Sequence, residues 1–238
     1  MQSPPTTAQA RRDLKALADE GTAAHSQRFF KTGPGEYAEG DRFIGVRVPA
    51  IRGVARQYRA LPHAGVLSLL RSRIHEERLL ALVILCDQYK RGDGAERKRI
   101  YDAYLANTAF VNNWDLVDAS AHKIVGPHLE SRSRGPLDRL ARSKSLWERR
   151  IAIVATFFFI QRGEFDDTLR IADRLLGDGE DLIHKAVGWM LREVGKRDRK
   201  REEEFLRERY GRMPRTMLRY AIERFPERRR KAYLKGAV

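Results

Sequence analysis

Cysteine is almost missing from this sequence, and its scarcity excludes several kinds of site. Cys86 is the only one, and it lies inside the apolar run LLALVILC. A single cysteine can form no internal disulfide, and it cannot supply a cysteine-ligated zinc site or an iron–sulfur cluster. We therefore expect no metal and no cofactor, and a reducing, cytoplasmic environment.

Long hydrophobic runs are missing as well. The longest apolar stretch, Ile151 to Ile160, is far shorter than the roughly 20 residues that cross a bilayer. The opening segment MQSPPTTAQARRDL lacks the apolar core of a signal peptide. We expect a soluble protein that is neither exported nor bound to a membrane.

Signals for β-strands are nearly absent, whereas apolar residues recur three and four positions apart through most of the chain. This pattern predicts an all-α fold. Capping residues and prolines place the expected helix starts at or near Thr7, Pro49, Pro62, Asn113, Pro136, Ser145, Asp166, Asp181 and Pro214.

Positive charge is abundant and concentrated near one end. The formal net charge is +15, and residues 196–238 alone hold 16 Lys and Arg against 7 Asp and Glu. Such a field attracts polyanions, above all nucleic acid. Because apolar residues alternate with the arginines, we expect packed helices with basic outer faces. A merely solvated charged face is the alternative.

Three segments resemble one another at regular spacing: EERLLALVIL (76–85), ERRIAIVATF (148–157) and IHKAVGWMLR (183–192). Their basic residues, Arg78, Arg150 and Lys185, are separated by about two repeats and one repeat of 35 to 36 residues, and the segment 112–126 fills the gap. This period is typical of HEAT-like helical hairpins, which stack into a solenoid with a concave face. We predict one such domain over residues 1–238, with a basic concave face. Chance similarity among helices is the alternative.

The repeat places five unusual residues in phase. Trp114, Arg150 and Lys185 occupy equivalent positions, and Asp118 and Trp189 follow four residues later on the same helical faces. Two of the three tryptophans, one carboxylate and two cations are therefore expected on one surface.

This set suits cleavage of an N-glycosidic bond, in which positive charge develops on the sugar. Asp118 could stabilise that charge or position the attacking water. Trp114 and Trp189 could flank a cationic base or sugar, while Arg150 and Lys185 could hold phosphates.

Purely structural roles are the alternative to this chemistry, because a tryptophan on a helix is often part of the core. Asp115 could be a charge that favours the helix dipole. The glycine-rich segment Thr32 to Gly45 could be a functional loop or an ordered connector.

At this point the chain resembles a known family, the AlkD family of bacterial alkylpurine DNA glycosylases. The motifs that carry the resemblance run in order over nearly the whole chain: RFFKTGPGEY (28–37), RFIGVRVP (42–49), NNWDLVD (112–118), SLWERRIAIV (145–154) and HKAVGWMLREVGK (184–196).

The resemblance implies a HEAT-like fold and a monofunctional enzyme of base excision repair. Family members excise N3- and N7-alkylated purines from duplex DNA, leave an abasic site and do not flip the lesion into a pocket. Asp118 matches the family's catalytic Asp, Trp114 and Trp189 match its active-site tryptophans, and Arg150 matches its phosphate-contacting Arg. The sequence departs from some members at Phe29, where they have a Tyr, so a hydrogen bond from that hydroxyl is in doubt.

We therefore expect a monomeric enzyme of the bacterial cytoplasm whose partner is double-stranded DNA with alkylated purines. Arg215 and Arg219, in the basic C-terminal region, are expected to add contacts to the DNA backbone. A non-catalytic nucleic-acid-binding HEAT scaffold is the main alternative, and a peptide-binding adaptor is a weaker one. Which lesion is preferred stays open.

Overall fold

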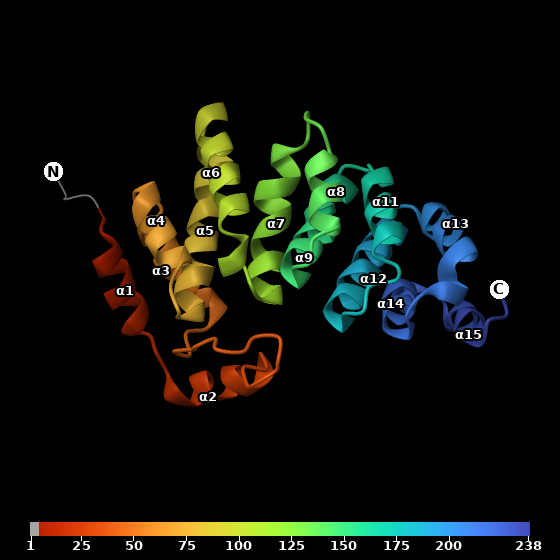
Figure 1. Cartoon of the computed structure of the whole chain (residues 1–238), viewed down its shortest axis with the longest axis horizontal. Helices are drawn as coiled ribbons and strands as arrows, with labels where there is room; N and C mark the ends of the chain where they lie inside the picture. Colours follow the sequence, from red (N-terminus) through yellow and green to blue (C-terminus); the bar gives the residue numbers. More distant parts are fainter. Residues whose placement is uncertain (1–4) are drawn as a thin grey trace. The chain divides into compact units, whose positions relative to one another are not determined.

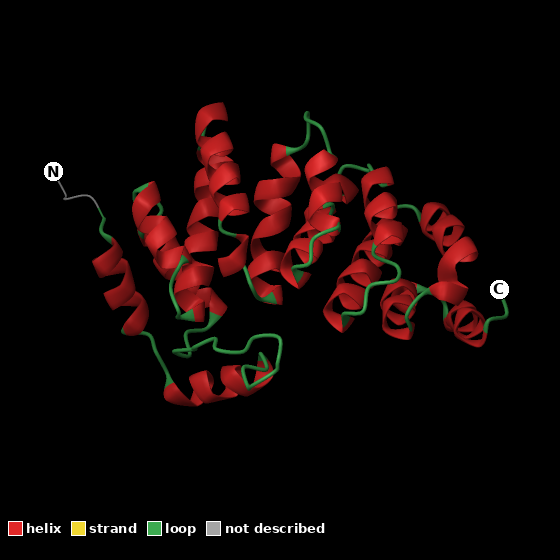
Figure 2. Ribbon diagram, viewed as in Figure 1, coloured by secondary structure: helices red, strands yellow, loops and turns green. Residues whose placement is uncertain are grey.

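The computed structural model describes residues 5–238, and over this range the chain consists of α-helices joined mostly by short turns (Figures 1 and 2). Within these residues there is no β-strand, and the only β-type pairing is an isolated bridge between Arg42 and Ile74. The predicted all-α, helical-repeat fold is confirmed. Residues 1–4, which open the segment considered above as a signal peptide, lie outside the described residues.

None of the helices between residues 5 and 238 combines the length and the apolar character needed to traverse a bilayer.

The chain divides into two compact units, Met1–Ser120 and Ala121–Val238. The boundary falls inside helix α7 (Trp114–His128). The first unit holds the start of α7 together with α1 (Thr7–Lys15), α2 (Glu20–Phe29), α3 (Val48–Gln57), α4 (His63–Leu70), α5 (His75–Arg91), α6 (Gly94–Ala106) and the short 3-10 helix η1 (Thr108–Phe110). That the whole chain forms one domain stays a prediction.

The second unit holds the rest of α7 and the helices that follow it. These are α8 (Gly135–Ala141), α9 (Leu146–Ala155), α10 (Phe157–Ile160), α11 (Asp166–Arg174), α12 (Asp181–Gly195), α13 (Arg199–Arg209), α14 (Arg215–Ala221) and α15 (Glu227–Lys235), with the 3-10 helices η2 (Tyr210–Arg212) and η3 (Ile222–Arg224).

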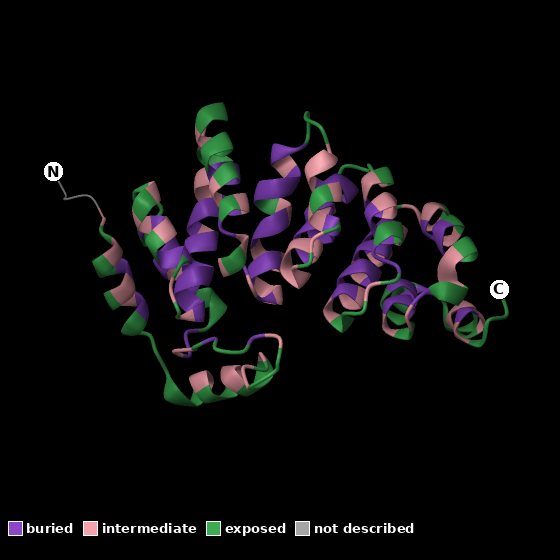
Figure 3. Cartoon of the chain, in the orientation of Figure 1, coloured by how far each residue is buried: buried purple, intermediate pink, exposed green. Residues whose placement is uncertain are grey.

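Helix α5 is the centre of the first unit, where it packs against α3, α4 and α6. Its middle, from Leu79 to Leu82 and on to Ile84 and Leu85, is buried on all sides (Figure 3). A helix that is apolar all round can be stable only inside a core, so the run LLALVIL forms the interior of this unit.

Helix α12 has the same role in the second unit, where it packs against α9, α11, α13 and α14. The approach of α14 is especially close at Gly188. A Cβ atom there would lie 2.5 Å from the carbonyl oxygen of Met217 and 2.5 Å from the Cβ of Tyr220. The missing side chain therefore permits this helix contact.

The sequence signals located these helices well. Every helix start predicted from caps and prolines lies within one residue of an observed start. Ser145, for example, caps α9 by accepting a hydrogen bond from the backbone N–H of Glu148. One repeat position recurs in the first two turns of four helices. It is occupied by Arg78 in α5, Trp114 in α7, Arg150 in α9 and Lys185 in α12.

A buried carboxyl group in α13 makes the stability of the second unit depend on pH. Glu202 is only 1% exposed, and its Oε1 has no hydrogen-bond partner in the described part of the chain. Its other oxygen lies against the backbone of Gly195, at the end of α12. Burial raises the pKa of Glu202 to about 8.

The folded protein therefore holds this proton more tightly than the unfolded chain, whose carboxyl has a pKa near 4.5. The contribution of Glu202 to the free energy of unfolding should be fully present below pH 4.5. It should decrease as the pH rises from there to about 8. We expect Glu202→Gln to remove this decrease, which amounts to several kcal/mol. Urea denaturation at pH 5, 7 and 9 checks this, with the exposed neighbour Glu204→Gln as control. Parallel pH curves for wild type and Glu202→Gln would contradict it.

Candidate functional site

Trp114 begins α7 and lies at one end of a stack of aromatic rings in the first unit. Its indole packs face to face on Phe30, with 5.1 Å between centroids and 19° between planes. Phe30 packs in the same way on Phe43, at 4.9 Å. The protein thus covers one face of the indole, while Trp114 as a whole is only half-buried.

Phe29, which the sequence resemblance matches to a Tyr of some members of the AlkD family, lies beside this stack at the end of α2. Its ring meets that of Trp114 edge-on, at 5.9 Å. The side chain is 56% exposed, which is unusual for a large apolar ring. Phe29 and Trp114 together therefore present an aromatic surface to solvent.

Asp118 lies one helical turn after Trp114, so the two side chains project from the same side of α7. Asp118 is half-buried. Its charge is one of the smaller contributions that raise the pKa of Tyr104, after the dominant effect of burial of that phenol. The helix therefore brings together these two predicted residues, an indole and a carboxylate.

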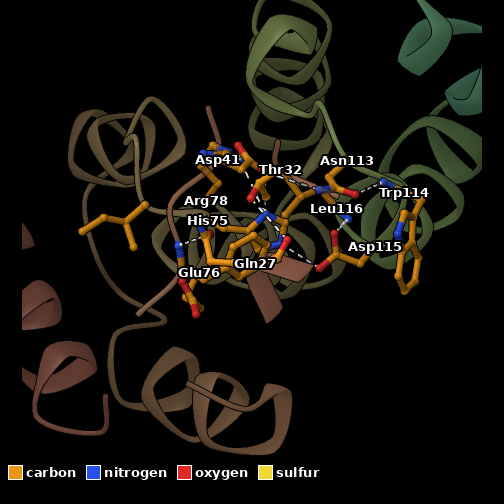
Figure 4. A network of polar contacts seen from close by, with 12 residues as sticks. Gln27, Thr32, Asp41, His75, Glu76, Arg78, Asn113, Trp114, Asp115 and Leu116 are labelled. Atoms are coloured by element: carbon orange, nitrogen blue, oxygen red, sulfur yellow. Dashed lines mark hydrogen bonds and ion pairs between the residues drawn. The ribbon is translucent and has the colours of Figure 1, made fainter. Parts of the chain in front are cut away.

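A buried polar network holds the start of α7 in place (Figure 4). Asp41, in the loop between α2 and α3, accepts hydrogen bonds from Nη2 of Arg78 at 2.6 Å and from Nδ2 of Asn113 at 3.3 Å. Asn113 in turn accepts the backbone N–H of Trp114 at 2.8 Å. His75 lies between two carboxylates, with Nδ1 3.0 Å from Asp41 and Nε2 2.8 Å from Asp115.

The charge state of Asp41 follows from this arrangement. Burial alone would raise the pKa of Asp41, but the hydrogen bond from His75 and the charge of Arg78 outweigh it and lower the pKa. Asp41 is therefore a buried anion. It is stable there only because His75 and Arg78 remain paired with it.

Glu76 anchors the same loop a few residues later. Its carboxylate accepts the backbone N–H groups of Ile44 at 3.1 Å, Gly45 at 2.8 Å and Val46 at 3.3 Å. Gly45 has a φ of +81°, and a Cβ atom there would lie 2.0 Å from the carbonyl oxygen of Asp19. The segment Thr32 to Gly45 is thus an ordered connector fixed to the first turn of α5.

Trp189, the other predicted tryptophan, lies on α12 in the second unit and is half-buried. Its ring lies 6.0 Å from that of Phe157, which meets the ring of His122 edge-on at 5.5 Å. Each predicted tryptophan therefore has phenylalanine neighbours within its own unit and keeps part of its surface accessible.

The two predicted phosphate-binding cations differ in exposure. Arg150 is 5% exposed, and its guanidinium donates to the backbone carbonyl of Leu182, which ties α9 to the start of α12. Lys185 is partly exposed and pairs with Asp181 one turn earlier, at 2.8 Å. Sequence reasoning placed both in contact with DNA, and the internal tie of Arg150 was not anticipated.

Arg215 and Arg219 are both exposed on α14. Arg215 donates to the backbone carbonyl of Leu234 at 2.7 Å. Because α14 packs on α12, these cations belong to the same unit as Lys185 and Trp189.

Sequence reasoning missed the polar network around His75. It treated Asp115 as a charge favourable to the helix dipole, and Asp115 does lie in the first turn of α7, but it also faces His75. The run HEER at the start of an apolar helix was the available signal, since four polar residues there need buried partners. The partners themselves are 34 and 40 residues away, and no local pattern identifies them.

Two glycines of the connector allow a matched test of its fit. Gly40 and Gly45 both have positive φ, but a Cβ atom at Gly40 meets nothing within 4 Å. We expect Gly40→Ala to lower the free energy of unfolding by about 1 kcal/mol, from backbone strain alone. Gly45→Ala should cost about 3 kcal/mol or more, because it adds the clash with Asp19. Urea denaturation measures both, and equal losses would show that the close approach is not required.

Comparisons with known proteins agree with this picture. A family model described as "DNA alkylation repair enzyme" matches residues 10–225. A solved structure from Enterococcus faecalis, described as a predicted DNA alkylation repair enzyme, is similar with a TM-score of 0.68 and 17% sequence identity, over 89% of this chain and 98% of that one. No curated protein sequence matches. Since the family model covers most of the chain, this protein belongs to the DNA alkylation repair enzyme family.

Proposed function

We propose that this protein is a DNA glycosylase that hydrolyses the N-glycosidic bond of N3- or N7-alkylated purines in duplex DNA. The single observation that carries the proposal is the pairing of a partly accessible indole, Trp114, with a carboxylate, Asp118, one turn apart on α7. Membership of the DNA alkylation repair enzyme family supports it.

The proposed reaction needs little from the protein beyond charge and position. The bond between C1′ of the sugar and N9 of the purine breaks, and the base leaves with the electron pair. Alkylation has given the base a positive charge, so it departs neutral and needs no strong general acid. Water adds its oxygen to C1′ and releases a proton, which leaves a reducing sugar in an unbroken strand.

In this reaction Asp118 stabilises the positive charge that develops on the sugar and orients the water. Trp114 lies beside the same charge, which an indole face attracts by about 0.5–2 kcal/mol. An open aromatic surface can do this without a closed pocket, so we also propose that the lesion is not flipped out of the duplex.

We assign Trp189 the same role from the second unit. We propose that Asp118 and Trp189 act on one substrate because the sequence repeat places both residues in phase.

Binding of the DNA backbone is assigned to cations of the second unit. Lys185, Arg215 and Arg219 have accessible side chains, whereas Arg150 is only 5% exposed. We propose a basic concave face made by these residues, on a protein that acts as a monomer in the bacterial cytoplasm.

Replacing the carboxylate tests the chemistry directly. We expect the wild-type protein to release 3-methyladenine or 7-methylguanine from methylated duplex DNA. Asp118→Asn should lower the single-turnover rate of release at least about 100-fold while leaving the Kd for the same duplex within about threefold. Chromatography of the released base measures the single-turnover rate. Fluorescence anisotropy measures the Kd.

The control for this test is Asp102→Asn, which removes an exposed carboxylate on α6. A wild-type protein that binds methylated DNA but releases no base, when a known glycosylase does so in parallel, would instead identify a non-catalytic DNA-binding scaffold.

Charge reversal on α14 tests the backbone contacts. Arg219→Glu should weaken binding about tenfold at 100 mM salt and reduce the slope of log Kd against log salt by about 1, because one phosphate contact is lost. Arg59→Glu changes the net charge equally at an exposed position of the first unit and serves as the control. Equal effects of the two substitutions would assign the loss to net charge alone.

A further inference from the structure

His75 is a buried group that the proposed chemistry does not use. It is the first residue of α5 and is 2% exposed. Its ring stacks on Phe43, with 4.3 Å between centroids and 22° between planes. His75 therefore completes the aromatic stack that runs through Phe43 and Phe30 to Trp114.

The contacts of this ring determine how many protons it carries. Nδ1 faces Asp41 at 3.0 Å and Nε2 faces Asp115 at 2.8 Å. A neutral imidazole has one N–H donor, whereas both carboxylates can only accept. Only the doubly protonated ring can donate to two ionised carboxylates at once, so this geometry favours an imidazolium.

The electrostatic surroundings agree with this conclusion. The charged groups that face His75 are Asp41 from the loop, Asp115 from α7 and Arg78 from α5. Burial would lower the pKa of His75, but the hydrogen bonds to Asp115 and Asp41 outweigh it and raise the pKa, against a smaller opposing effect of Arg78. The Phe43 ring against the cation also favours the charged form.

Both carboxylates lead directly to the first turn of α7. Asp115 is the residue after Trp114. Asp41 accepts from Asn113, which in turn accepts the backbone N–H of Trp114. Loss of the imidazolium proton would leave one carboxylate facing a ring nitrogen lone pair, and the repulsion would act on the residues that hold Trp114.

We propose that His75 is a positioning residue whose imidazolium fixes the first turn of α7, and with it Trp114, so that the indole and Asp118 are aligned only while His75 is protonated. The effect on base release rests on the function proposed above. The effect on Trp114 does not.

The indole N–H resonances of ¹⁵N-labelled protein test the structural part. The chain has three tryptophans, and Trp147→Phe and Trp189→Phe assign the spectrum. From pH 5 to 9 the Trp114 signal should shift with the same midpoint as the ring protons of His75, above the usual 6.5. In His75→Gln that transition should disappear. His63→Gln, which alters another histidine of the first unit, should leave the transition in place.

Base release tests the consequence for catalysis. His75→Gln should lower the single-turnover rate about tenfold at pH 7 with the Kd for DNA within about threefold, while His63→Gln keeps the wild-type rate. Asp115→Asn keeps an acceptor for Nε2 but removes its charge. It should therefore retain most of the rate at pH 6 and move the midpoint of the pH profile to lower pH.

Three results would overturn the proposal: a Trp114 resonance that does not change between pH 5 and 9, a folded His75→Gln protein with wild-type rate, or an unmoved midpoint in Asp115→Asn. If His75→Gln does not fold, Asp115→Asn decides. If the wild type releases no base, the proposed function fails, and the Trp114 resonance still decides the role of His75.

Discussion

The first unit depends on the pairing of charges that are buried at the start of α5. Glu76 and Arg78 are each 3% exposed, a placement that costs several kcal/mol per ion unless every charge has a partner. Their partners are the backbone of the connector, Asp41 and, through His75, the first turn of α7. The helix core, the connector and the aromatic stack are consequently one cooperative structure, and Trp114 takes its position from it.

Local signals were sufficient for the helices, because caps, prolines and apolar spacing act within a few residues. They were also sufficient to place Trp114 and Asp118 one turn apart on the same side of α7, because helical spacing alone does this. They could not reveal the network of His75, since its contacts with Asp41 and Asp115 are set by tertiary packing. Nor could they separate an ordered connector from a functional loop between Thr32 and Gly45, because glycine is common in both.

The basic residue that recurs in the repeat does not have the same role in every repeat. Arg78 and Arg150 occupy equivalent places in α5 and α9, and both are buried donors to backbone carbonyls, those of Ser72 and Leu182. In these two repeats the cation joins neighbouring helical segments. Only at Lys185 is the equivalent residue substantially accessible. The period of the sequence predicts the helical repeat. The burial of each cation distinguishes those that hold helical segments together from those that lie at the surface.

The contact of Gly45 with the backbone at Asp19 has a consequence for the divergence of this sequence. The carbonyl of Asp19 occupies the place of a side chain at position 45, and the backbone N–H of Asp19 bonds to the carbonyl of Ile44. Any relative with a larger residue at 45 must have rerouted the turn before α2. These two places should therefore covary among descendants of this fold.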